Sequence, residues 1–326
     1  MAISSRDGDD SRAHRRRPKV SRRTTLILLA AALVLMVALW LYSTRDYRPV
    51  FSRTAGELIQ VRDSTGFGRA EDGKQLTEVT LVSDTGLEVR VRVRALGERT
   101  GTRHPAALMV GGMRTGRKTV DVPLETENLI LASVDYPYDG PVWPEGWHWV
   151  RYLIPLRRGF LETPPALLLA AQYLYTRDDV DPERVSIIGV SLGVPFAAAT
   201  AATDRRLAGA ALLHGGADIR RMAYYAYADA GPPWVMNGLA VVTAWLVAPL
   251  EPTKYAGEIA PRPTLVVNAT DDERIDPHSG DRLQRAVRQP KRVIWHESGH
   301  VHRSQTEIVV ELMELTLEWM DANGLR

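Results

Sequence analysis

The sequence predicts an α/β fold, in which a mostly parallel sheet carries helices on both faces and an antiparallel hairpin at its N-terminal edge. One observation is that short apolar runs alternate with helix-like segments after residue 104. Another is a pair of alternating runs on either side of a turn signal within residues 76–95, and a third is an N-terminal transmembrane segment. We expect a basic tail at 1–23, a transmembrane anchor at 24–42, a stalk and lead-in at 43–75, and a folded domain at 76–326 with a cap-like insertion at about 218–258.

Composition excludes several classes of protein. The 326 residues are 45% hydrophobic and 25% charged, which is ordinary for a globular chain. The chain contains no cysteine, which excludes disulfides, cysteine nucleophiles and cysteine-ligated zinc. Residues 1–23 carry a net charge of +5 and the remainder −3, so the basic character belongs to the tail and nothing indicates a nucleic-acid surface.

The segment 24–42 is uncharged and mostly apolar. Its 19 residues, at about 1.5 Å each, just span a hydrocarbon core of roughly 30 Å. The arginine-rich tail before it predicts a cytoplasmic N-terminus and an extracytoplasmic domain. A cleaved signal peptide is the alternative, but its apolar region is usually shorter and a clear A-x-A site is missing.

The elements of the domain follow in order. Residues 78–82 and 87–95 flank Asp84-Thr85-Gly86, which is typical of a hairpin turn. In the second run the arginines alternate with valines, which predicts a half-exposed pair of strands. We expect further strands at 106–110, 129–134, 185–188, 210–213, 264–267 and 292–295, with helices at 164–176, 194–203 and 306–322.

The region 218–258 interrupts this alternation. It is rich in tyrosine and tryptophan, and it contains the apolar stretch 239–250, which is too short to span a bilayer. This pattern predicts an inserted helical cap or a buried helix.

Gly189-Val190-Ser191-Leu192-Gly193 is a G-x-S-x-G sequence between a predicted strand and a small-residue helix. A strand, a tight turn and a helix are what a nucleophile elbow requires, because the turn must expose the serine hydroxyl. The structural alternative is a glycine-rich turn that only lets the strand and helix pack closely.

An activated serine needs a base, and the base needs an orienting acid. Asp271 and Asp272 follow the strand at 264–267, whereas His296, His300 and His302 follow or end the strand at 292–295. The chain order Ser, Asp, His is the order found in α/β-hydrolases. A metal site in the H-x-x-x-H-x-H run is disfavoured because it lacks carboxylate partners at useful spacing.

From about residue 104 to 322 the chain resembles the α/β-hydrolase superfamily, in particular the dienelactone hydrolase, prolyl-oligopeptidase and acyl-CoA thioester hydrolase-like branches. The resemblance lies in the elbow, in 180–185 before it, and in 259–265 followed by the acid loop. It implies Asp272 as the acid in preference to Asp271, with Asp276 replacing a usual proline. It also implies His300, in Gly299-His300, as the base.

An oxyanion hole needs backbone N–H donors aimed at the developing negative charge. The amide of Leu192, just after the nucleophile, is the expected first donor. The resemblance implies Met113, in the loop after strand 106–110, as the second, although Gly111-Gly112 replaces the family's usual His-Gly pair. Arg114 either points into the site or is exposed on the loop.

An aromatic group follows the strand at 129–134: Trp143, Trp147, Trp149 and Tyr152. Either these side chains wall an apolar substrate pocket together with the cap aromatics, or they pack in the core.

These residues predict a serine hydrolase that cleaves an ester or thioester through an acyl-enzyme, on the outer side of a membrane. The catalytic residues are Ser191, Asp272 and His300, and we expect a small-molecule acyl substrate, no cofactor and no metal. The alternatives are an acyltransferase or peptidase that uses the same triad, and a non-catalytic α/β-hydrolase scaffold that binds a ligand or partner.

Overall fold

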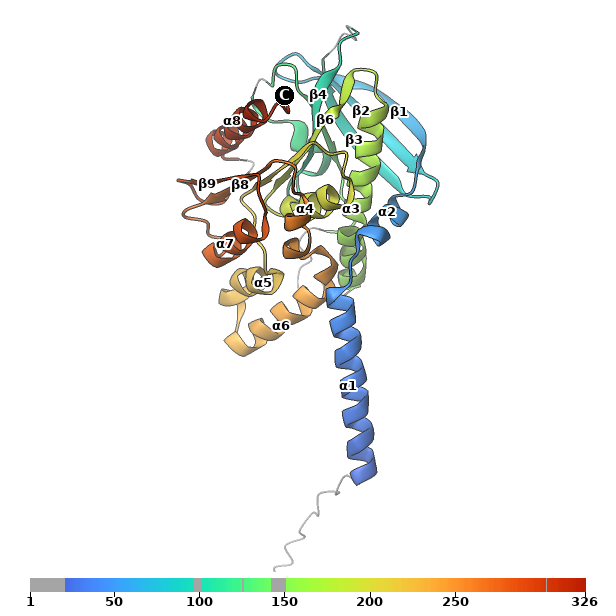
Figure 1. The fold of residues 1–326 in the computed structure, drawn as a ribbon, viewed down its shortest axis with the longest axis vertical. Helices are drawn as coiled ribbons and strands as arrows, with labels where there is room; N and C mark the ends of the chain where they lie inside the picture. Colours follow the sequence, from blue (N-terminus) through green and yellow to red (C-terminus); the bar gives the residue numbers. More distant parts are fainter. Residues whose placement is uncertain (1–20, 97–100, 125, 142–150, 303) are drawn as a thin grey trace, which may run out of the picture. The chain divides into compact units, whose positions relative to one another are not determined.

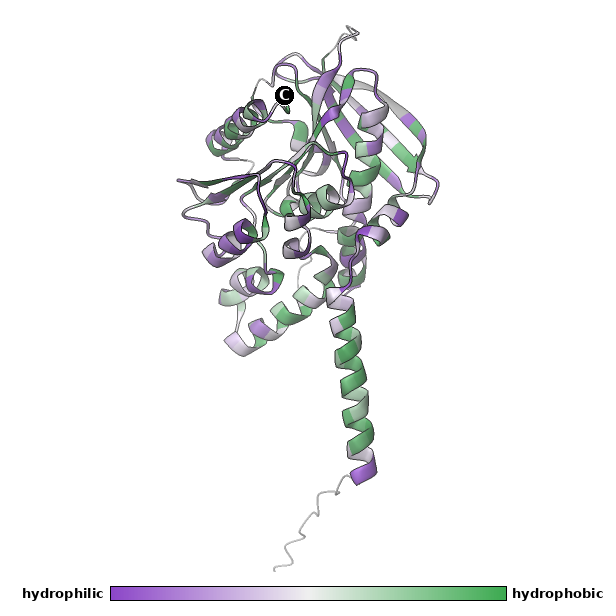
Figure 2. Cartoon of the chain, viewed as in Figure 1, coloured by the Kyte–Doolittle hydropathy of each residue, from purple (hydrophilic) through white to green (hydrophobic). Residues whose placement is uncertain are grey.

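The computed structural model describes residues 21–96, 101–124, 126–141, 151–302 and 304–326, without the side chains of residues 63–67. It divides into two units, Met1–Thr44 and Arg45–Arg326. The first contains helix α1 (Arg22–Thr44), which has no buried residue. Its length and composition suffice to cross a membrane, and signal sequences share these properties. Figure 2 shows the hydrophobic colouring of this helix along nearly all of its length.

The second unit is built on a nine-stranded sheet of order β1-β2-β3-β5-β4-β6-β7-β8-β9 (Figure 1). The strands are β1 (Leu58–Arg69), β2 (Gln75–Ser83), β3 (Glu88–Ala95), β4 (His104–Val110), β5 (Ile130–Val134), β6 (Val180–Val190), β7 (Gly209–Leu213), β8 (Thr264–Ala269) and β9 (Lys291–His296). The pairs from β1 to β3, and β3 with β5, are antiparallel. All the remaining pairs are parallel. The predicted fold class, a mostly parallel sheet with an antiparallel N-terminal edge, is confirmed.

Helices cover both faces of the sheet. Helices α3 (Leu153–Thr176) and α4 (Gly193–Thr203) contact the central strands on one face. Helix α8 (Thr306–Ala322) packs on the opposite face, where its Trp319 and Met109 of β4 belong to one core cluster. The central strands are therefore buried on both faces, which explains their continuous apolar runs in the sequence.

The chain reverses its direction of travel across the sheet at β4. Strand β5 returns to lie between β3 and β4, and β6 then pairs with the other edge of β4. Ligand sites in open α/β sheets form at such switch points, beyond the carboxyl ends of the strands. Here these ends carry the loop after Val110 and the turn after Val190.

The region 43–75, expected as a stalk and lead-in, contains helix α2 (Arg48–Ala55) and the edge strand β1. The side-chain amide of Gln172 in α3 fixes their junction, because it donates to Gly56 O (2.8 Å) and accepts from Leu58 N (3.0 Å). Strand β1 lacks apolar alternation, and its described side chains are exposed or half-buried. Helix α3 also begins well before residue 164 and continues through Pro164 and Pro165, which the sequence-based boundary treated as a start.

The prediction of a half-exposed β3 is wrong for two of its arginines. Arg92 and Arg94 are only 3% and 2% exposed, because the chain after β4, including the 3-10 helix η1 (Gly116–Val120), covers them. The Arg94 guanidinium pairs with Asp72 (2.6 Å) and donates to the carbonyls of Val120 (3.1 Å), Val122 (2.8 Å) and Leu124 (2.9 Å). The arginine face of β3 is therefore exposed at Glu88 and Arg90 but buried at Arg92 and Arg94.

Residues 218–258 form the helical insertion, with α5 (Ile219–Tyr227), α6 (Pro233–Leu246), η3 (Ala228–Ala230), η4 (Ala248–Leu250), η5 (Pro252–Lys254) and η6 (Ala256–Glu258). The Glu251 carboxylate accepts from the backbone amides of Asp218 (2.9 Å) and Ile219 (2.9 Å). One side chain thus joins the two ends of the α5–α6 segment. Helix α7 (Pro277–Ala286), which the sequence pattern did not indicate, completes the element list.

Replacement of Arg94 by alanine tests the buried network. We expect Arg94→Ala to lower the free energy of unfolding by about 3 kcal/mol or more, since it leaves the Asp72 carboxylate and three carbonyls without their main donor. The control is Arg62→Ala, whose partner Glu88 is 55% exposed and whose loss should cost less than about 1 kcal/mol. Urea unfolding of the full chain in detergent micelles measures both, and equal costs would contradict the expectation.

Candidate active site

Ser191 occupies the turn between β6 and α4. Its φ is 54°, in the left-handed region that few residues other than glycine adopt. Its amide donates to Leu213 O (2.8 Å), and its carbonyl accepts from Val194 N (3.1 Å). This strained, hydrogen-bonded turn is the geometry of a nucleophile elbow.

The two flanking glycines are required by close packing. A Cβ atom on Gly193 would lie 1.9 Å from the carbonyl oxygen of Val110 at the end of β4. A Cβ atom on Gly189 would lie 2.6 Å from the Cβ of Ala197 in α4. The G-x-S-x-G spacing therefore lets strand, turn and helix meet without a side chain between them.

A chain of hydrogen bonds joins the three sequence-predicted residues. Ser191 Oγ lies 2.7 Å from His300 Nε2, and His300 Nδ1 lies 3.0 and 2.9 Å from the two carboxylate oxygens of Asp272. The side chains of His300 and Asp272 are only 2% and 5% exposed. The arrangement has the connectivity of a serine nucleophile, a base and an orienting acid.

The Asp272 carboxylate is stabilised in its charged form. Burial alone would raise its pKa, but the hydrogen bond and charge of His300 and the backbone amides of Ile275 and Arg274 hold the pKa of Asp272 below its usual value. The two amides donate to Oδ1 at 2.8 and 2.9 Å. An ionised carboxylate at this position fixes the Nδ1–H tautomer of the imidazole.

The alternative acid and bases lie elsewhere. Asp271 is exposed and accepts from the hydroxyl of Thr270 (3.2 Å). His296 lies 2.7 Å from Ser298 Oγ and 3.0 Å from Glu311. His302 lies 3.3 Å from Glu273. The structure therefore brings Asp272 and His300, rather than these neighbours, to Ser191.

Two residues that the sequence did not single out hold the loop of His300. The Glu273 carboxylate accepts the His300 amide (2.9 Å), and His214 Nδ1 accepts the Val301 amide (3.1 Å). The backbone hydrogen bond from His300 lowers the pKa of Glu273 to about 2. The sequence shows Glu273 next to the predicted acid and His214 at the end of β7. A single sequence does not indicate that either residue contacts the loop of His300.

His214 is completely buried beside the site. Its φ is 48°, and its ring centroid lies 6.2 Å from that of His300. Burial, and then the neighbouring His300, lower the pKa of His214 to about 4. Because Nδ1 accepts a hydrogen bond, the neutral ring carries its proton on Nε2, which has no hydrogen-bond partner among the described residues.

His214, Asp272 and His300 are also the residues best placed to hold a metal ion, with ligand atoms within 4.8 Å of one another. The hydrogen bond between His300 and Asp272 and the one from Val301 to His214 already account for this clustering. The donor set therefore fits a hydrogen-bonded triad with a supporting histidine.

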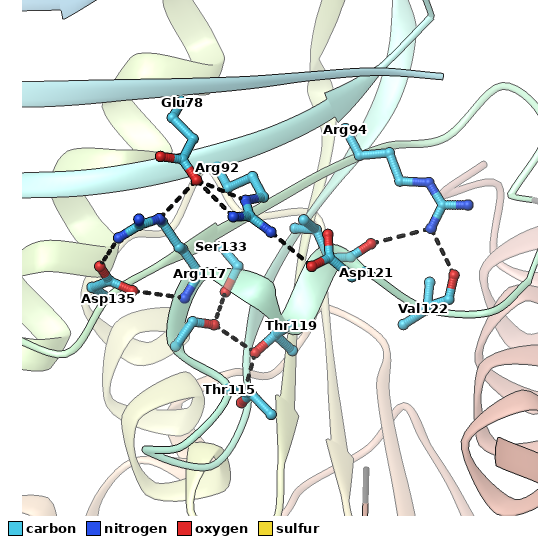
Figure 3. Close-up of polar contacts among 12 residues, drawn as sticks. Glu78, Arg92, Arg94, Thr115, Arg117, Thr119, Asp121, Val122, Ser133 and Asp135 are labelled. Carbon is cyan, nitrogen blue, oxygen red and sulfur yellow. Dashed lines mark hydrogen bonds and ion pairs between the residues drawn. The ribbon is translucent and has the colours of Figure 1, made fainter. Parts of the chain in front are cut away.

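The loop after β4 faces the same end of the sheet and is tightly anchored (Figure 3). Tyr136 Oη donates to Gly111 O, and burial raises the pKa of Tyr136, so the hydroxyl remains a donor. The Asp135 carboxylate accepts the Arg117 amide (3.0 Å) and pairs with its guanidinium, which also contacts Glu78 (2.9 Å). Arg92 joins Glu78 (2.7 Å) to Asp121 (2.7 Å), so the hairpin and β5 both hold this loop.

The two expected oxyanion donors come from different elements. Leu192 is the N-terminal capping residue of α4, and Met113 lies in the turn before η1. In the described part of the chain, neither amide donates to another protein group. Arg114 is exposed on the same loop. The assignment of both amides as oxyanion donors stays a prediction.

The predicted aromatic wall is described only in part. Trp143, Trp147 and Trp149 lie outside the described residues, whereas Tyr152 caps α3. Tyr152 lines a cavity of about 690 Å³, together with residues such as Leu87 and Tyr138, but none of the three triad residues borders this cavity.

Comparisons with known proteins agree with this geometry. The model of the prolyl oligopeptidase family matches residues 163–324, which include the elbow, the acid loop and His300. An acetyl xylan esterase from Paenibacillus sp. is similar in structure, with a TM-score of 0.63 and 17% identity over 83% of this chain and 92% of that one. Acetyl xylan esterase 1 from Thermoanaerobacterium sp. has a TM-score of 0.58 and 15% identity over 84% of this chain and 94% of its own.

A puromycin-hydrolyzing peptidase of Mycobacterium tuberculosis has a TM-score of 0.55 and 18% identity, over 79% of this chain and 46% of its own. No curated protein matches the chain in sequence. At these identities the structural likenesses show the fold alone.

The buried His214 predicts acid-sensitive stability. Its pKa is about 4 in the folded state against an ordinary value of 6.5, so the unfolded state binds more protons between these values. Stability is then fully present above about pH 6.5 and falls by roughly 3 kcal/mol as the pH drops to 4. His214→Asn should remove this loss, because asparagine tolerates the left-handed backbone and its amide oxygen can replace Nδ1 as acceptor. Unfolding at several pH values measures this, with the exposed His278→Asn as control; an unchanged pH slope in His214→Asn would contradict it.

The elbow at Ser191, the strand order around β4 and the family match point the same way. They are three different kinds of observation: a backbone conformation, a sheet topology and a sequence match over residues 163–324. The chain has the α/β-hydrolase fold, and its residues 163–324 match the model of the prolyl oligopeptidase family.

Proposed function

We propose that this chain is a serine hydrolase that cleaves carboxylic esters through Ser191, His300 and Asp272. The observation that carries the proposal is the continuous hydrogen-bonded chain from Ser191 Oγ through His300 to Asp272, at 2.7 and 2.9 Å. It starts at a strained backbone position that the packing of two glycines makes possible. Strain of this kind persists where surrounding structure enforces it, and it clusters at active sites.

The proposed reaction has two halves. In the first, His300 Nε2 takes the proton of Ser191 as its Oγ attacks the acyl carbonyl, and then gives it to the leaving alkoxide as the tetrahedral intermediate collapses. In the second, His300 takes a proton from water, the hydroxide attacks the acyl-enzyme, and the proton returns to Ser191 as the acid leaves. Asp272 keeps the imidazole in the required tautomer and stabilises its charged form.

The amides of Leu192 and Met113 are the proposed donors to the oxyanion. The anchoring of the loop 111–121 supports this role, because donors that are already fixed in place need no reorganisation during the reaction. The fixed points are the carboxylates of Asp135 and Glu78 and the hydroxyl of Tyr136.

An ester is favoured over a peptide by the similar structures, two of which are acetyl xylan esterases that this chain covers by 92% or more. The family match and the peptidase of Mycobacterium tuberculosis support a peptidase as the second candidate. A thioester or an acyl acceptor other than water requires no change to the triad. A purely binding role is disfavoured, since such scaffolds usually lose a triad member.

The proposed location is the outer side of a membrane, with α1 as the anchor. The helix is long and apolar enough to cross a bilayer. The positive charge of residues 1–23 precedes it, which favours a cytoplasmic N-terminus.

The nucleophile and the acid are tested by single substitutions in the full chain in detergent micelles. We expect Ser191→Ala to lower kcat for p-nitrophenyl esters by at least about 10⁴-fold and to abolish labelling by a fluorophosphonate. Asp272→Asn should lower kcat by about 10⁴-fold because it favours the wrong tautomer. The control Asp271→Asn should leave kcat unchanged. Full activity in Ser191→Ala would refute the proposal.

Glu273 is tested as a positioning residue. Glu273→Ala removes the acceptor of the His300 amide, and we expect kcat to fall by about 10- to 100-fold as the imidazole shifts. Glu273→Gln keeps an oxygen acceptor and should recover most of the activity, with KM nearly unchanged in both variants. Equal losses in the two variants would instead assign the effect to the charge of Glu273.

A further inference from the structure

Helix α6 exposes large apolar side chains. Trp234 is 79% exposed, Val242 50%, Val241 45% and Leu239 37%. The helix buries two residues, Met236 and Ala240. The helix has no charged residue, and Figure 2 shows hydrophobic colouring along most of it. Most of the large apolar side chains of this helix therefore face solvent rather than the protein core.

The outward face of α6 is fixed by contacts on its inner side. Tyr227 Oη of α5 lies 3.2 Å from Thr243 Oγ1, and the Arg157 guanidinium of α3 donates to Leu246 O (2.9 Å). The adjoining helix α5 adds two exposed aromatic rings, Tyr224 at 37% and Tyr225 at 40%. Several large apolar side chains exposed on one helix mark an interaction site.

The linker between the proposed anchor and the folded unit is short. Helix α1 ends at Thr44 and α2 begins at Arg48, so residues 45–47 alone join the proposed anchor to the folded unit. Three residues span at most about 10 Å. The proposed anchor is therefore tethered to the folded unit by a linker of at most about this length.

We propose that the outer face of α6 inserts into the interfacial layer of the membrane that holds α1, and that the substrate is an ester dissolved in that membrane. The inference rests on the proposed anchor and on the proposed hydrolase activity. Its occupant is lipid, rather than a protein partner or a second copy of the chain.

The dimensions and chemistry of α6 suit this layer. Its 14 residues make a helix of about 21 Å, too short to span a bilayer but suited to lie in its plane. Tryptophan and tyrosine favour the boundary between hydrocarbon and water. Because the helix lacks basic residues, its binding depends on apolar burial, so neutral lipid suffices and salt has little effect.

The inserted segment 218–258 also contacts the loop that carries Asp272. Arg221 of α5 pairs with Asp276, which follows the loop of Asp272. Met222 of α5 and Ile275 of the acid loop also pack around the same glycine, because a Cβ atom on Gly216 would touch both of them. Helix α5 therefore links the proposed membrane contact of α6 to the acid loop.

The absence of cysteine allows a direct test with single labelled cysteines in the full chain. Val242→Cys, Leu33→Cys in α1 and the exposed Glu314→Cys in α8 are each labelled with a nitrobenzoxadiazole probe. The proteins are reconstituted in phosphatidylcholine vesicles with doxyl lipids whose quencher lies near the headgroup or deep in the chain. We expect shallow quenching at Val242→Cys at low and high salt, deep quenching at Leu33→Cys and none at Glu314→Cys.

Each other outcome has a defined meaning. Quenching at Leu33→Cys but not at Val242→Cys overturns the docking of α6 and leaves the anchor intact. Protection of the Val242→Cys probe from iodide without lipid quenching assigns α6 to a protein partner and also overturns the proposal. Quenching at neither position overturns anchor and docking together. Fluorophosphonate labelling of Ser191 in the same vesicles reports separately on the hydrolase, so its failure would count against the activity and not against the docking.

A second measurement tests the substrate class. Val242→Asp should lower the rate on a long-chain ester held in vesicles by about tenfold, because a charge opposes insertion, while the rate on p-nitrophenyl acetate in water stays unchanged. The matched control Val293→Asp, at a valine that is 38% exposed on β9, should change neither rate. Equal loss on both esters, or no loss on the vesicle-held ester, would overturn a membrane-dissolved substrate.

Discussion

The contact between Gly193 and the carbonyl of Val110 is the constraint on which the site depends. It brings the first turn of α4 against the end of β4, where a side chain of any size would strike the backbone. Ser191, two residues before Gly193, adopts the left-handed conformation, and the loop after β4 starts at the same contact. The nucleophile and the proposed oxyanion donors thus share one packing requirement.

Buried charge gives the loop after β4 its rigidity. Arg92 and Arg94 of β3 reach carboxylates or carbonyls of the loop, and Arg117 of the loop reaches Glu78 of β2 and Asp135 after β5. Moving the loop would therefore leave several ionised groups without partners at once. A single buried pair often contributes little net stability, since desolvation offsets attraction. A network of this kind instead selects one conformation, which is what a preorganised site needs.

The sequence predicted those features that local patterns encode. The elbow lies within five residues, and continuous apolar runs marked the buried parallel strands, so Ser191, β4 and β6 to β8 were found. The approach of Asp272 and His300 to Ser191 required the resemblance to a superfamily, because the residues lie far apart in the chain. Arg92 and Arg94 were assigned to the surface because the covering segment comes later in the chain, and His214 and Glu273 act through backbone amides that no side-chain pattern records.

The Glu251 carboxylate has a consequence for how such a protein can diversify. It binds the amides at the start of α5 from a position just after η4, so the chain leaves the sheet and returns to it at nearly one point. A segment whose ends already meet adds little loop-closure entropy if it is lengthened, shortened or exchanged. The cap can therefore be treated as a replaceable module: new surfaces or specificities could be grafted between Asp218 and Glu251 while the sheet and the triad keep their own folding energetics.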